Sequence, residues 1–562
     1  MQQKTYIVGL VGLFIAVTTM WAVPARRDGR TVMQANGTAI TIYQQGDEWC
    51  HWLTNDNGEW ITLNAEGNYE VVQKLTPAEI EAKRTQRSPR RAQQQLQTAY
   101  PLNIAPHGLI ILIYYQDNLF RYDKASFERL INSDNYHREY KYTSGGKETW
   151  VIADGSAKQY FTDQSNGKYQ PVFDIAGPYQ VSNEMKYYGE NDYNGYDLRP
   201  EEMIIEACQA ADKDGVDFTL YDSNNDGKID FVYVIYAGFG ENDGGDANTI
   251  WPHSYTFSDH YYAPKNAGGL GKDTVRIDGK VLDSYACGNE INYKSDQLNG
   301  IGTFCHEFGH VLGFPDIYQT ITGTTAKTSG NWDVMDYGIY NNDGNTPPAY
   351  SGYERFFLGW ITPTLLHEAA NVTLPELQES NACGLITATG SHNLIGNDPD
   401  PTTFYLVENR QKTGWDKFLP GHGMMLTKIQ YSYSRWLANT VNNNASALGI
   451  DIIEADGQTP IRGIGSNGKV GDLFPAGATE YTGIQGHTIT NITETDSTIY
   501  FKLNGGGKET ILDVPSTTYS SEIETINDLM GRAVGSDTEM LPHGIYILRT
   551  KDNHTSKVLI NR

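Results

Sequence analysis

Two histidines four residues apart carry the clearest sign of chemistry in this sequence. The segment 306–316 reads HEFGHVLGFPD, so an α-helix places the imidazoles of His306 and His310 on one face. Two neutral imidazoles suit zinc, and the carboxylate of Asp316 can reach the same metal once the chain has turned at Gly313. Three protein ligands leave a fourth position for water, which is the arrangement of a catalytic zinc site.

Glu307 is the residue that we expect to act as general base. It follows His306 on the same helix, close enough to a metal-bound water to take its proton without being a ligand. Zinc lowers the pKa of bound water to about 7, so a zinc-bound water beside Glu307 is suited to attack a carbonyl. The HExxH pattern alone is weak, because two histidines on one helix face are more often ordinary surface or core residues. Its continuation through Gly313 to Asp316 favours the zinc interpretation.

A second segment, 329–338, reads SGNWDVMDYG and follows the zinc motif. It is similar to the methionine turn of metzincin-type zinc peptidases, which lies beneath the metal. That resemblance implies that Met335 packs under the histidines and that Tyr337 hydrogen-bonds the developing oxyanion. Taken alone, the pair is more typical of a core methionine beside a surface tyrosine. Asp333 and Asp336 are the next candidates for the third ligand if Asp316 does not bind.

The elements that must position these residues form a mixed α+β pattern. Continuous apolar runs at 108–115 and 229–237 predict buried strands. After about residue 361 short strands alternate with turns, the pattern of a β-sandwich. We therefore expect a metzincin-like domain with a twisted mixed sheet and a zinc-binding helix, followed by β-sandwich regions. The predicted helices cover 155–167, 200–212 and 299–313.

The beginning of the chain has the pattern of a secreted precursor. Lys4 precedes an apolar run at 7–17 that is too short to span a bilayer, and Ala22 or Ala25 can end a signal peptide. The basic, proline-broken segment 83–91 is typical of an exposed linker, whether or not a protease cuts it. The expected organisation is a signal peptide (1–22), a propeptide (23–99), a catalytic domain (100–361), a β-rich region completing the peptidase unit (362–503), a glycine-rich linker (504–510) and a C-terminal domain (511–562).

One acidic loop suggests a second metal. Oxygen donors alternate along it with Gly227 at the sixth position, as in the first half of a calcium loop, but Tyr233 stands where the twelfth-position glutamate is expected. The alternative is an Asx-rich turn leading into the next strand. The possible calcium ligands are Asp222, Asn224, Asp226, Lys228 through its carbonyl, and Asp230.

Charge and cysteine content narrow the function classes. The net charge of −25 argues against nucleic acid as a partner, because phosphate binding needs clustered cations. No CxxC pair occurs among the five cysteines, so a thiolate zinc site is not indicated. Cys50 in the expected propeptide could act as a latency switch at the zinc, or could be a buried small residue. Beyond the signal peptide no segment is apolar enough for a transmembrane span, so we expect a secreted or cell-surface protein.

Further blocks resemble the secreted metallopeptidases of the immune inhibitor A family over roughly residues 100–503. These blocks are 155–161, 167–178, 222–245, 250–253, 354–360, 408–410 and 471–475, besides the zinc motif. The resemblance implies extracellular proteolysis and a cleavable propeptide. Segments 529–532, 541–547 and 557–560 look like a type IX secretion sorting domain, which implies that secretion machinery as a partner. The alternative for this end is a small accessory β-sandwich.

The sequence therefore predicts a secreted zinc endopeptidase that acts on proteins or peptides and binds its own propeptide. Two alternatives stay open. One is a calcium-stabilised adhesin with a vestigial zinc site, against which the retention of Glu307 argues, since loss of the base would be the first sign of decay. The other is an amidase for cell-wall peptide, because the same zinc chemistry cleaves any amide.

Overall fold

The chain divides into two compact units, Met1–Leu512 and Asp513–Arg562, which are described separately. The computed structural model describes residues 21–80, 106–257, 275–320, 329–458, 468–512, 523–528, 532–535, 544–550 and 555–560, apart from positions 27, 48, 49, 77, 145, 193, 194 and 196. The predicted signal peptide up to residue 20 and the predicted linker segment 83–91 lie outside the described residues.

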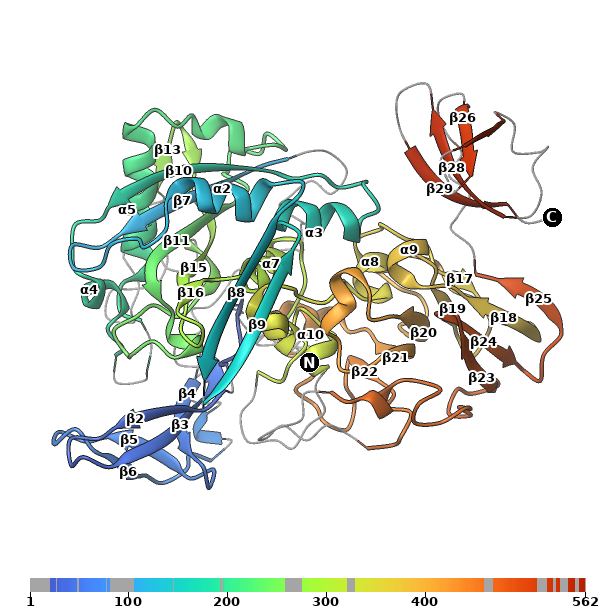
Figure 1. The fold of residues 1–562 in the computed structure, drawn as a ribbon, viewed down its shortest axis with the longest axis horizontal. Helices are drawn as coiled ribbons and strands as arrows, with labels where there is room; N and C mark the ends of the chain where they lie inside the picture. The colour runs from blue at the N-terminus through green and yellow to red at the C-terminus, as the bar shows by residue number, and fades with distance from the viewer. Residues whose placement is uncertain are drawn as a thin grey trace, which may run out of the picture. The chain divides into compact units, whose positions relative to one another are not determined.

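A seven-stranded mixed sheet forms the centre of the first unit (Figure 1). Its order is β1-β12-β15-β11-β7-β10, with β16 also paired to β15. The strands from β15 to β10 are parallel, whereas β12 is antiparallel to β15 and β1 is antiparallel to β12. The strands are β1 (Trp21–Ala22), β7 (His107–Tyr114), β10 (Val172–Gln180), β11 (Val232–Phe239), β12 (His253–Thr256), β15 (Ser284–Asn292) and β16 (Gln297–Leu298).

Helices cover both faces of this sheet, because side chains alternate along its buried strands. Leu109 and Ile111 of β7 pack in one apolar cluster with α5, while Ile110 and Leu112 pack in the other with α2, α3 and α7. The apolar runs at 108–115 and 229–237 are thus confirmed as buried strands. The three predicted helices are also confirmed: those at 155–167 and 299–313 are shorter at both ends, and that at 200–212 extends by one residue. The helices are α2 (Lys124–Asn132), α3 (Ala157–Gln164), α5 (Pro200–Lys213) and α7 (Gly302–Val311).

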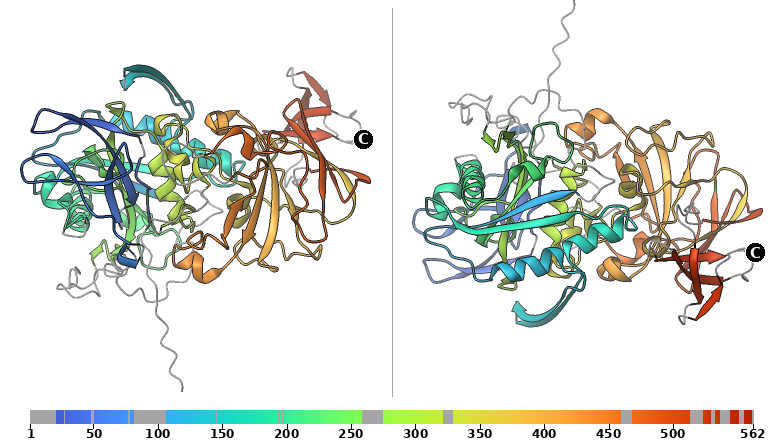
Figure 2. Two further views of the ribbon diagram at one scale, coloured as in Figure 1. Left: turned by 90° about the horizontal axis from the view of Figure 1, so that it is seen from below. Right: turned by 90° about the horizontal axis from the view of Figure 1, so that it is seen from above.

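Two further sheets follow α8 (Gly352–Phe357), and a shared apolar core lies between them, as in a sandwich. In Figure 2, α7 lies between the central sheet and the yellow and orange strands of this β-rich part. The first sheet has the order β17 (Thr364–Leu365), β19 (Gly384–Ile386), β20 (Thr403–Arg410), β21 (Gly423–Gln430) and β22 (Ile450–Ile452). The second has the order β23 (Ile489–Thr495), β24 (Thr498–Leu503), β18 (Ala370–Leu374) and β25 (Lys508–Ile511).

Strand β25 corrects one sequence-based boundary. Residues 504–510 were expected to form a glycine-rich linker, but Lys508–Ile511 pair in parallel with β18. The glycines only make the turn that precedes the strand, where Gly505 and Gly506 have φ of +85° and +90°. The sandwich therefore extends to Leu512, whose side chain is fully buried.

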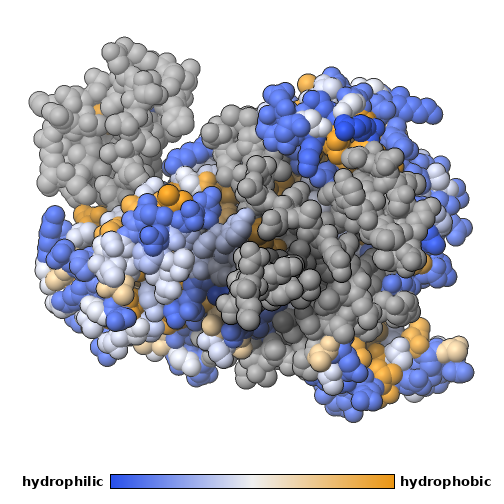
Figure 3. Space-filling view, turned by 180° about the vertical axis from the view of Figure 1, so that it is seen from behind, coloured by the Kyte–Doolittle hydropathy of each residue, from blue (hydrophilic) through white to orange (hydrophobic). Residues whose placement is uncertain are grey.

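A five-stranded antiparallel sheet forms the N-terminal part of the first unit, with strands in chain order. Its own core is small and contains Cys50, Trp60 and Ile80. Figure 3 shows apolar side chains among polar ones on the surface at the lower right, over this sheet. The strands are β2 (Arg30–Met33), β3 (Ala39–Asp47), β4 (Cys50–Asn55), β5 (Trp60–Leu63) and β6 (Tyr69–Val71).

The remaining elements of the first unit are short. They are the pairs β8 (His137–Ser144) with β9 (Lys147–Asp154) and β13 (Arg276–Ile277) with β14 (Lys280–Val281), the helices α4 (Met185–Gly189), α9 (Leu377–Ser380) and α10 (Tyr433–Leu437), and the 3-10 turns η1 (Phe218–Tyr221), η2 (Glu241–Asp243), η4 (Gly330–Trp332), η5 (Tyr337–Gly344), η6 (Gly414–Phe418) and η7 (Val470–Asp472).

The second unit is an antiparallel sheet of order β27-β26-β28-β29. Its strands are β26 (Ile523–Asp528), β27 (Ala533–Gly535), β28 (Gly544–Thr550) and β29 (Thr555–Ile560). Two of the segments that resemble a sorting domain, 529–532 and 541–547, are described only in part. Their residues 529–531 and 541–543 lie outside the described residues. Across the part of the chain that the structure describes, no helix is long and apolar enough to cross a membrane.

Candidate metal centre

Helix α7 is buried along its whole length, because it packs between the central sheet and the β-rich part. A helix that is apolar on all sides is typical of such a position. Gly309 is required where Met335 packs against the helix, since a Cβ there would lie 2.6 Å from the Met335 sulfur. Met335 thus lies against the turn that separates His306 from His310.

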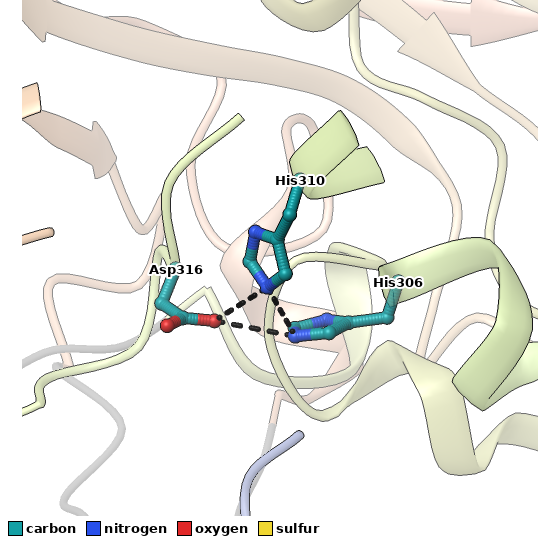
Figure 4. Close-up of side chains that lie close together, drawn as sticks. All are labelled: His306, His310 and Asp316. Carbon is teal, nitrogen blue, oxygen red and sulfur yellow. Dashed lines mark hydrogen bonds and ion pairs between the residues drawn. The ribbon is translucent and has the colours of Figure 1, made fainter. Parts of the chain in front are cut away.

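His306, His310 and Asp316 converge on one point (Figure 4). Asp316 Oδ1 lies 3.2 Å from His306 Nε2 and 3.4 Å from His310 Nε2, and the two Nε2 atoms are 3.1 Å apart. All three side chains are almost fully buried. Among the described residues, only this set brings at least three possible ligand atoms of His, Cys, Asp or Glu within 4.8 Å of one another.

The outer atoms of both imidazoles are held by the backbone. His306 Nδ1 lies 2.8 Å from the carbonyl oxygen of Val334, and His310 Nδ1 lies 2.9 Å from that of Phe314. A proton on each Nδ1 then donates to the carbonyl and leaves Nε2 as a bare acceptor, which is how metal-binding histidines are usually oriented. Two imidazole nitrogens and one carboxylate oxygen form a donor set that suits zinc.

Asn439 clamps the third candidate ligand. Its Oδ1 accepts from the amide of Asp316 at 2.7 Å, and its Nδ2 donates to Asp316 Oδ2, which leaves Oδ1 directed at the imidazoles. Burial alone would raise the pKa of Asp316, but the two histidines outweigh it and lower the pKa to about 2. Sequence reasoning missed Asn439, because it lies 123 residues beyond Asp316 and no local motif marks it.

Glu307 faces the first described residues of the chain. Its Oε1 accepts a hydrogen bond from the Val23 amide at 3.2 Å, and its buried Oε2 has no hydrogen-bond partner among the described residues. Burial, followed by the charge of Asp316, raises the pKa of Glu307 well above its usual value, although the Val23 amide opposes this. The carboxyl is therefore enclosed, one residue from His306, with one oxygen still to be satisfied.

The segment 21–26 runs extended past Glu307 and is held by its backbone. Trp21 and Ala22 pair antiparallel with β12 at the edge of the central sheet. Trp251 Nε1 donates to the carbonyl of Val23 at 3.0 Å, and the Tyr340 hydroxyl donates to the carbonyl of Pro24 at 2.5 Å. Addition of an extended strand to a sheet edge is a common way for proteins to bind peptides.

The other residues predicted near the metal occupy supporting positions. Asp333 Oδ1 accepts from the Met335 amide, and Asp336 accepts from the amides of Gly330 and Tyr337, so both carboxylates hold the turn. Neither belongs to the set of possible metal ligands. Tyr337 is buried at the start of η5, and its role at the oxyanion stays a prediction.

The predicted calcium loop is closed by its own hydrogen bonds and by a lysine. Asp222 Oδ2 lies 2.5 Å from Lys280 Nζ, and both Asp222 oxygens accept from backbone amides of the loop. Asp230 accepts from the amide of Ser223 at 2.7 Å, and burial raises its pKa to about 6. Asn224 and Asp226 also accept from loop amides, and Lys228 Nζ pairs with Asp283. Calcium at this loop stays a prediction.

Cys50 lies away from the metal centre in the small core of the N-terminal sheet. The adjacent His51 is one of the residues of this sheet that contact the part of the unit around the central sheet. Its ring stacks on Trp251 at 4.7 Å between centroids, and its Nε2 lies 3.2 Å from Glu241 Oε1. The described contacts thus bring the backbone of Val23, and not the Cys50 thiol, to Glu307.

Comparison with known proteins also indicates a peptidase, in the part of the chain that contains this candidate site. Among curated relatives, the chain is 27% identical over 338 residues to "Immune inhibitor A" of Bacillus thuringiensis subsp. alesti, covering 54% of this chain and 47% of that protein. It is 27% identical over 259 residues to "Pre-pro-metalloprotease PrtV" of Vibrio cholerae, covering 42% of this chain and 26% of that protein. A "Putative secreted metallopeptidase" of Arthroderma benhamiae is 26% identical over 230 residues, 32% of each chain.

The chain spans about half the length of the first of these relatives and about a quarter of the second. The family model described as "Immune inhibitor A peptidase M6, catalytic domain" matches residues 107–360, from the first residue of β7 to just beyond α8. This range contains α7, all three candidate ligands and Glu307. Residues 107–360 are thus similar to a peptidase M6 catalytic domain of the immune inhibitor A type, and the comparisons support a metallopeptidase.

Proposed function

We propose that this protein is a secreted zinc endopeptidase, in which His306, His310 and Asp316 hold the metal and Glu307 is the general base. The observation that carries the proposal is the buried cluster of three donors with an enclosed carboxyl one residue away. The match of the surrounding region to a metallopeptidase domain supports it. The names of the relatives, which include a secreted metallopeptidase, support export of the protein.

Bound zinc would supply a Lewis acid for the scissile carbonyl and acidify an attacking water. The chain's own residues do the rest. Glu307 takes a proton from the water and delivers it to the leaving amide nitrogen, and its Oε2 lies free of other hydrogen bonds for this purpose among the described contacts. The carbonyl of Val334 and the amide of Asn439 hold His306 and Asp316 in place throughout. Tyr337 is the proposed oxyanion donor.

The N-terminal residues act as the protein's own inhibitor in this proposal. An extended segment that pairs with β12 and donates an amide to Glu307 stands where a substrate backbone would bind. The N-terminal sheet adds His51, which packs on Trp251. Residues 23–99 are therefore proposed as a propeptide, and residues 513–562 as a domain recognised by secretion machinery.

The deciding experiment is hydrolysis of casein by the secreted, processed protein, freed of its N-terminal residues, with and without a zinc chelator. We expect the chelator to stop hydrolysis and added zinc to restore it. Casein left intact in every condition would contradict the proposal. A protein that cleaves bacterial cell-wall peptide but not casein would instead be an amidase, and unaltered binding to surfaces without any hydrolysis would support the adhesin alternative.

A further inference from the structure

The side chain of Arg26 is buried, although it belongs to a segment that must leave the cleft before the enzyme can work. Its side chain is only 4% exposed, and that of its partner Asp343 only 2%. Arg26 Nη2 lies 2.5 Å from Asp343 Oδ1, and Arg26 Nη1 donates to Asn292 Oδ1 at 3.0 Å. The ring of Tyr340 lies 5.5 Å from the guanidinium carbon.

These three partners belong to the peptidase domain and stay behind when the segment leaves, whereas Asp28, which accepts from Arg26 Nε at 2.8 Å, leaves with the segment. Asn292 ends β15, while Tyr340 and Asp343 are on η5, just beyond the methionine turn. A third acid, Asp243, contributes attraction to Arg26, and its buried Oδ1 has no hydrogen-bond partner among the described residues. Burial raises the pKa of Asp243 to about 7. When a cation leaves this pocket, the carboxyl groups of Asp243 and Asp343 therefore lose a charged partner and gain little solvation in its place.

The backbone beneath the pocket is held in an unusual conformation. Asn342 and Asp343 both have positive φ, at +50° and +59°, which interrupts η5. Asn345 fixes this kink by donating to the carbonyl of Asp343 at 3.2 Å, and the Tyr140 hydroxyl donates to Asp343 Oδ2 at 2.9 Å. Two consecutive non-glycine residues in the left-handed region persist only where the surroundings determine them, and such strain gathers at binding sites.

The register of the segment relates this pocket to the reaction. In hydrolysis the general base returns its proton to the amide nitrogen of the broken bond. The nitrogen that lies against Glu307 here is that of Val23, so the bond between Ala22 and Val23 occupies the position of a scissile bond. Counted from that bond, Arg26 is the fourth residue on the carboxyl side.

We propose that the pocket formed by Asn292, Tyr340 and Asp343, on which the charge of Asp243 also acts, is a substrate subsite for a basic side chain, four residues after the scissile bond. The inference rests on the proposed peptidase function and names its substrate class, peptides with arginine or lysine at that position. Arg26 of the inhibitory segment occupies the subsite until a substrate replaces it. The fork of arginine suits the pocket best, because it reaches Asp343 and Asn292 together.

The test compares two fluorescent peptides that copy residues 20–30, one with the natural arginine at position 26 and one with glutamine there. Both are offered to the secreted, processed protein, first with a chelator so that binding is measured without turnover, then with zinc so that kcat/KM is measured. We expect the arginine peptide to bind at least tenfold more tightly and to be cleaved at least tenfold better.

The variant Asp343→Asn should bring both ratios close to one. Asparagine tolerates positive φ and keeps an acceptor for Tyr140, and Asp243→Asn is the second variant if the first does not fold. The matched control is Asp296→Asn, because Asp296 is an acid whose side chain is 68% exposed and pairs with Arg121. The subsite is overturned if wild type binds and cleaves the two peptides equally well, or if Asp343→Asn keeps the preference for the arginine peptide. Preferential binding of the arginine peptide without any cleavage would leave the subsite standing and would reject the peptidase function instead.

Discussion

The backbone nitrogen of Val23 donates a hydrogen bond to Glu307 Oε1 at 3.2 Å, across 284 residues of sequence. Val23 also begins the chain that remains if the signal peptide is removed after Ala22. The first residue of the secreted protein would then contact Glu307, the proposed general base. Removal after Ala25 would discard this contact altogether, so the two possible signal cleavage sites have opposite consequences for latency.

We therefore expect a secreted version that begins at Val23 to be latent and a version that begins at Arg26 to hydrolyse casein at least tenfold faster. Each can be produced behind a foreign signal peptide, with the first residue checked by N-terminal sequencing. The two share every residue from Arg26 onward, so each is the other's control. Equal initial rates would show that Val23 does not restrain Glu307.

Replacement of Glu307 by glutamine should lower kcat by roughly 10²–10⁴-fold, because the amide cannot take a proton. Its shape is kept, so the metal content should be unchanged. Asp316→Ala should instead release the metal, since it removes one of three protein ligands. Metal analysis of both purified variants beside their activity checks the assignment, and loss of zinc from the Glu307 variant would move that residue into the ligand set.

Asn439→Ala should weaken metal binding by about 10–100-fold without touching a ligand, the usual effect of removing a group that orients one. Competition with a chromophoric chelator measures the affinity. Asn444→Ala is the matched control, because Asn444 is exposed and, among the described residues, its side chain accepts only from the amide of Ser446 in the same loop. An affinity equal to that of the control would remove Asn439 from the metal centre.

The contact between His51 and Glu241 should weaken as pH rises, so the N-terminal sheet should dissociate more readily at higher pH. Burial by itself lowers the pKa of His51, but Glu241, with help from Asp47, raises it above the ordinary 6.5. A raised folded-state pKa means that the stabilisation is complete below 6.5 and is lost as pH rises through the higher value. The rate at which added trypsin detaches the N-terminal part should therefore increase over this range in wild type, and His51→Gln should remove that dependence.

Calcium should raise the melting temperature of the zinc-loaded protein if the loop at Asp222 binds it, by an amount equivalent to ~2.7 kcal/mol at a calcium concentration 100 times Kd. In the structure Lys280 already pairs with Asp222, so the ion has to displace an ammonium group. Lys280→Met should then enlarge the calcium-dependent shift, whereas Asp226→Ala should reduce it. Melting curves that do not respond to calcium in wild type or in Lys280→Met would leave the loop as a turn.

Local patterns were sufficient to predict the buried strands, α7 and the convergence of His306, His310 and Asp316. Each depends on spacing within a few residues, and periodicity reports such spacing directly. The Asn439 clamp, the Val23 contact and the Arg26 pocket were not predictable, because they join residues more than a hundred positions apart. The glycine run at 505–507 was taken for the start of a linker, since a turn and a linker have the same composition and only the pairing of β25 distinguishes them.

The Asn439 clamp also limits how this protein can be divided or recombined. Asn439 lies beyond residue 360, outside the region that matches the family model, yet it fixes Asp316 inside that region. Nearby, the Trp436 indole donates to the carbonyl of Gly313 and Asn442 donates to that of Ile317, so the β-rich part holds the segment around the proposed third ligand on both sides. The matched region is therefore not an exchangeable module. A chimera that joined it to a foreign sandwich would keep the two histidines and lose the fixed position of the carboxylate.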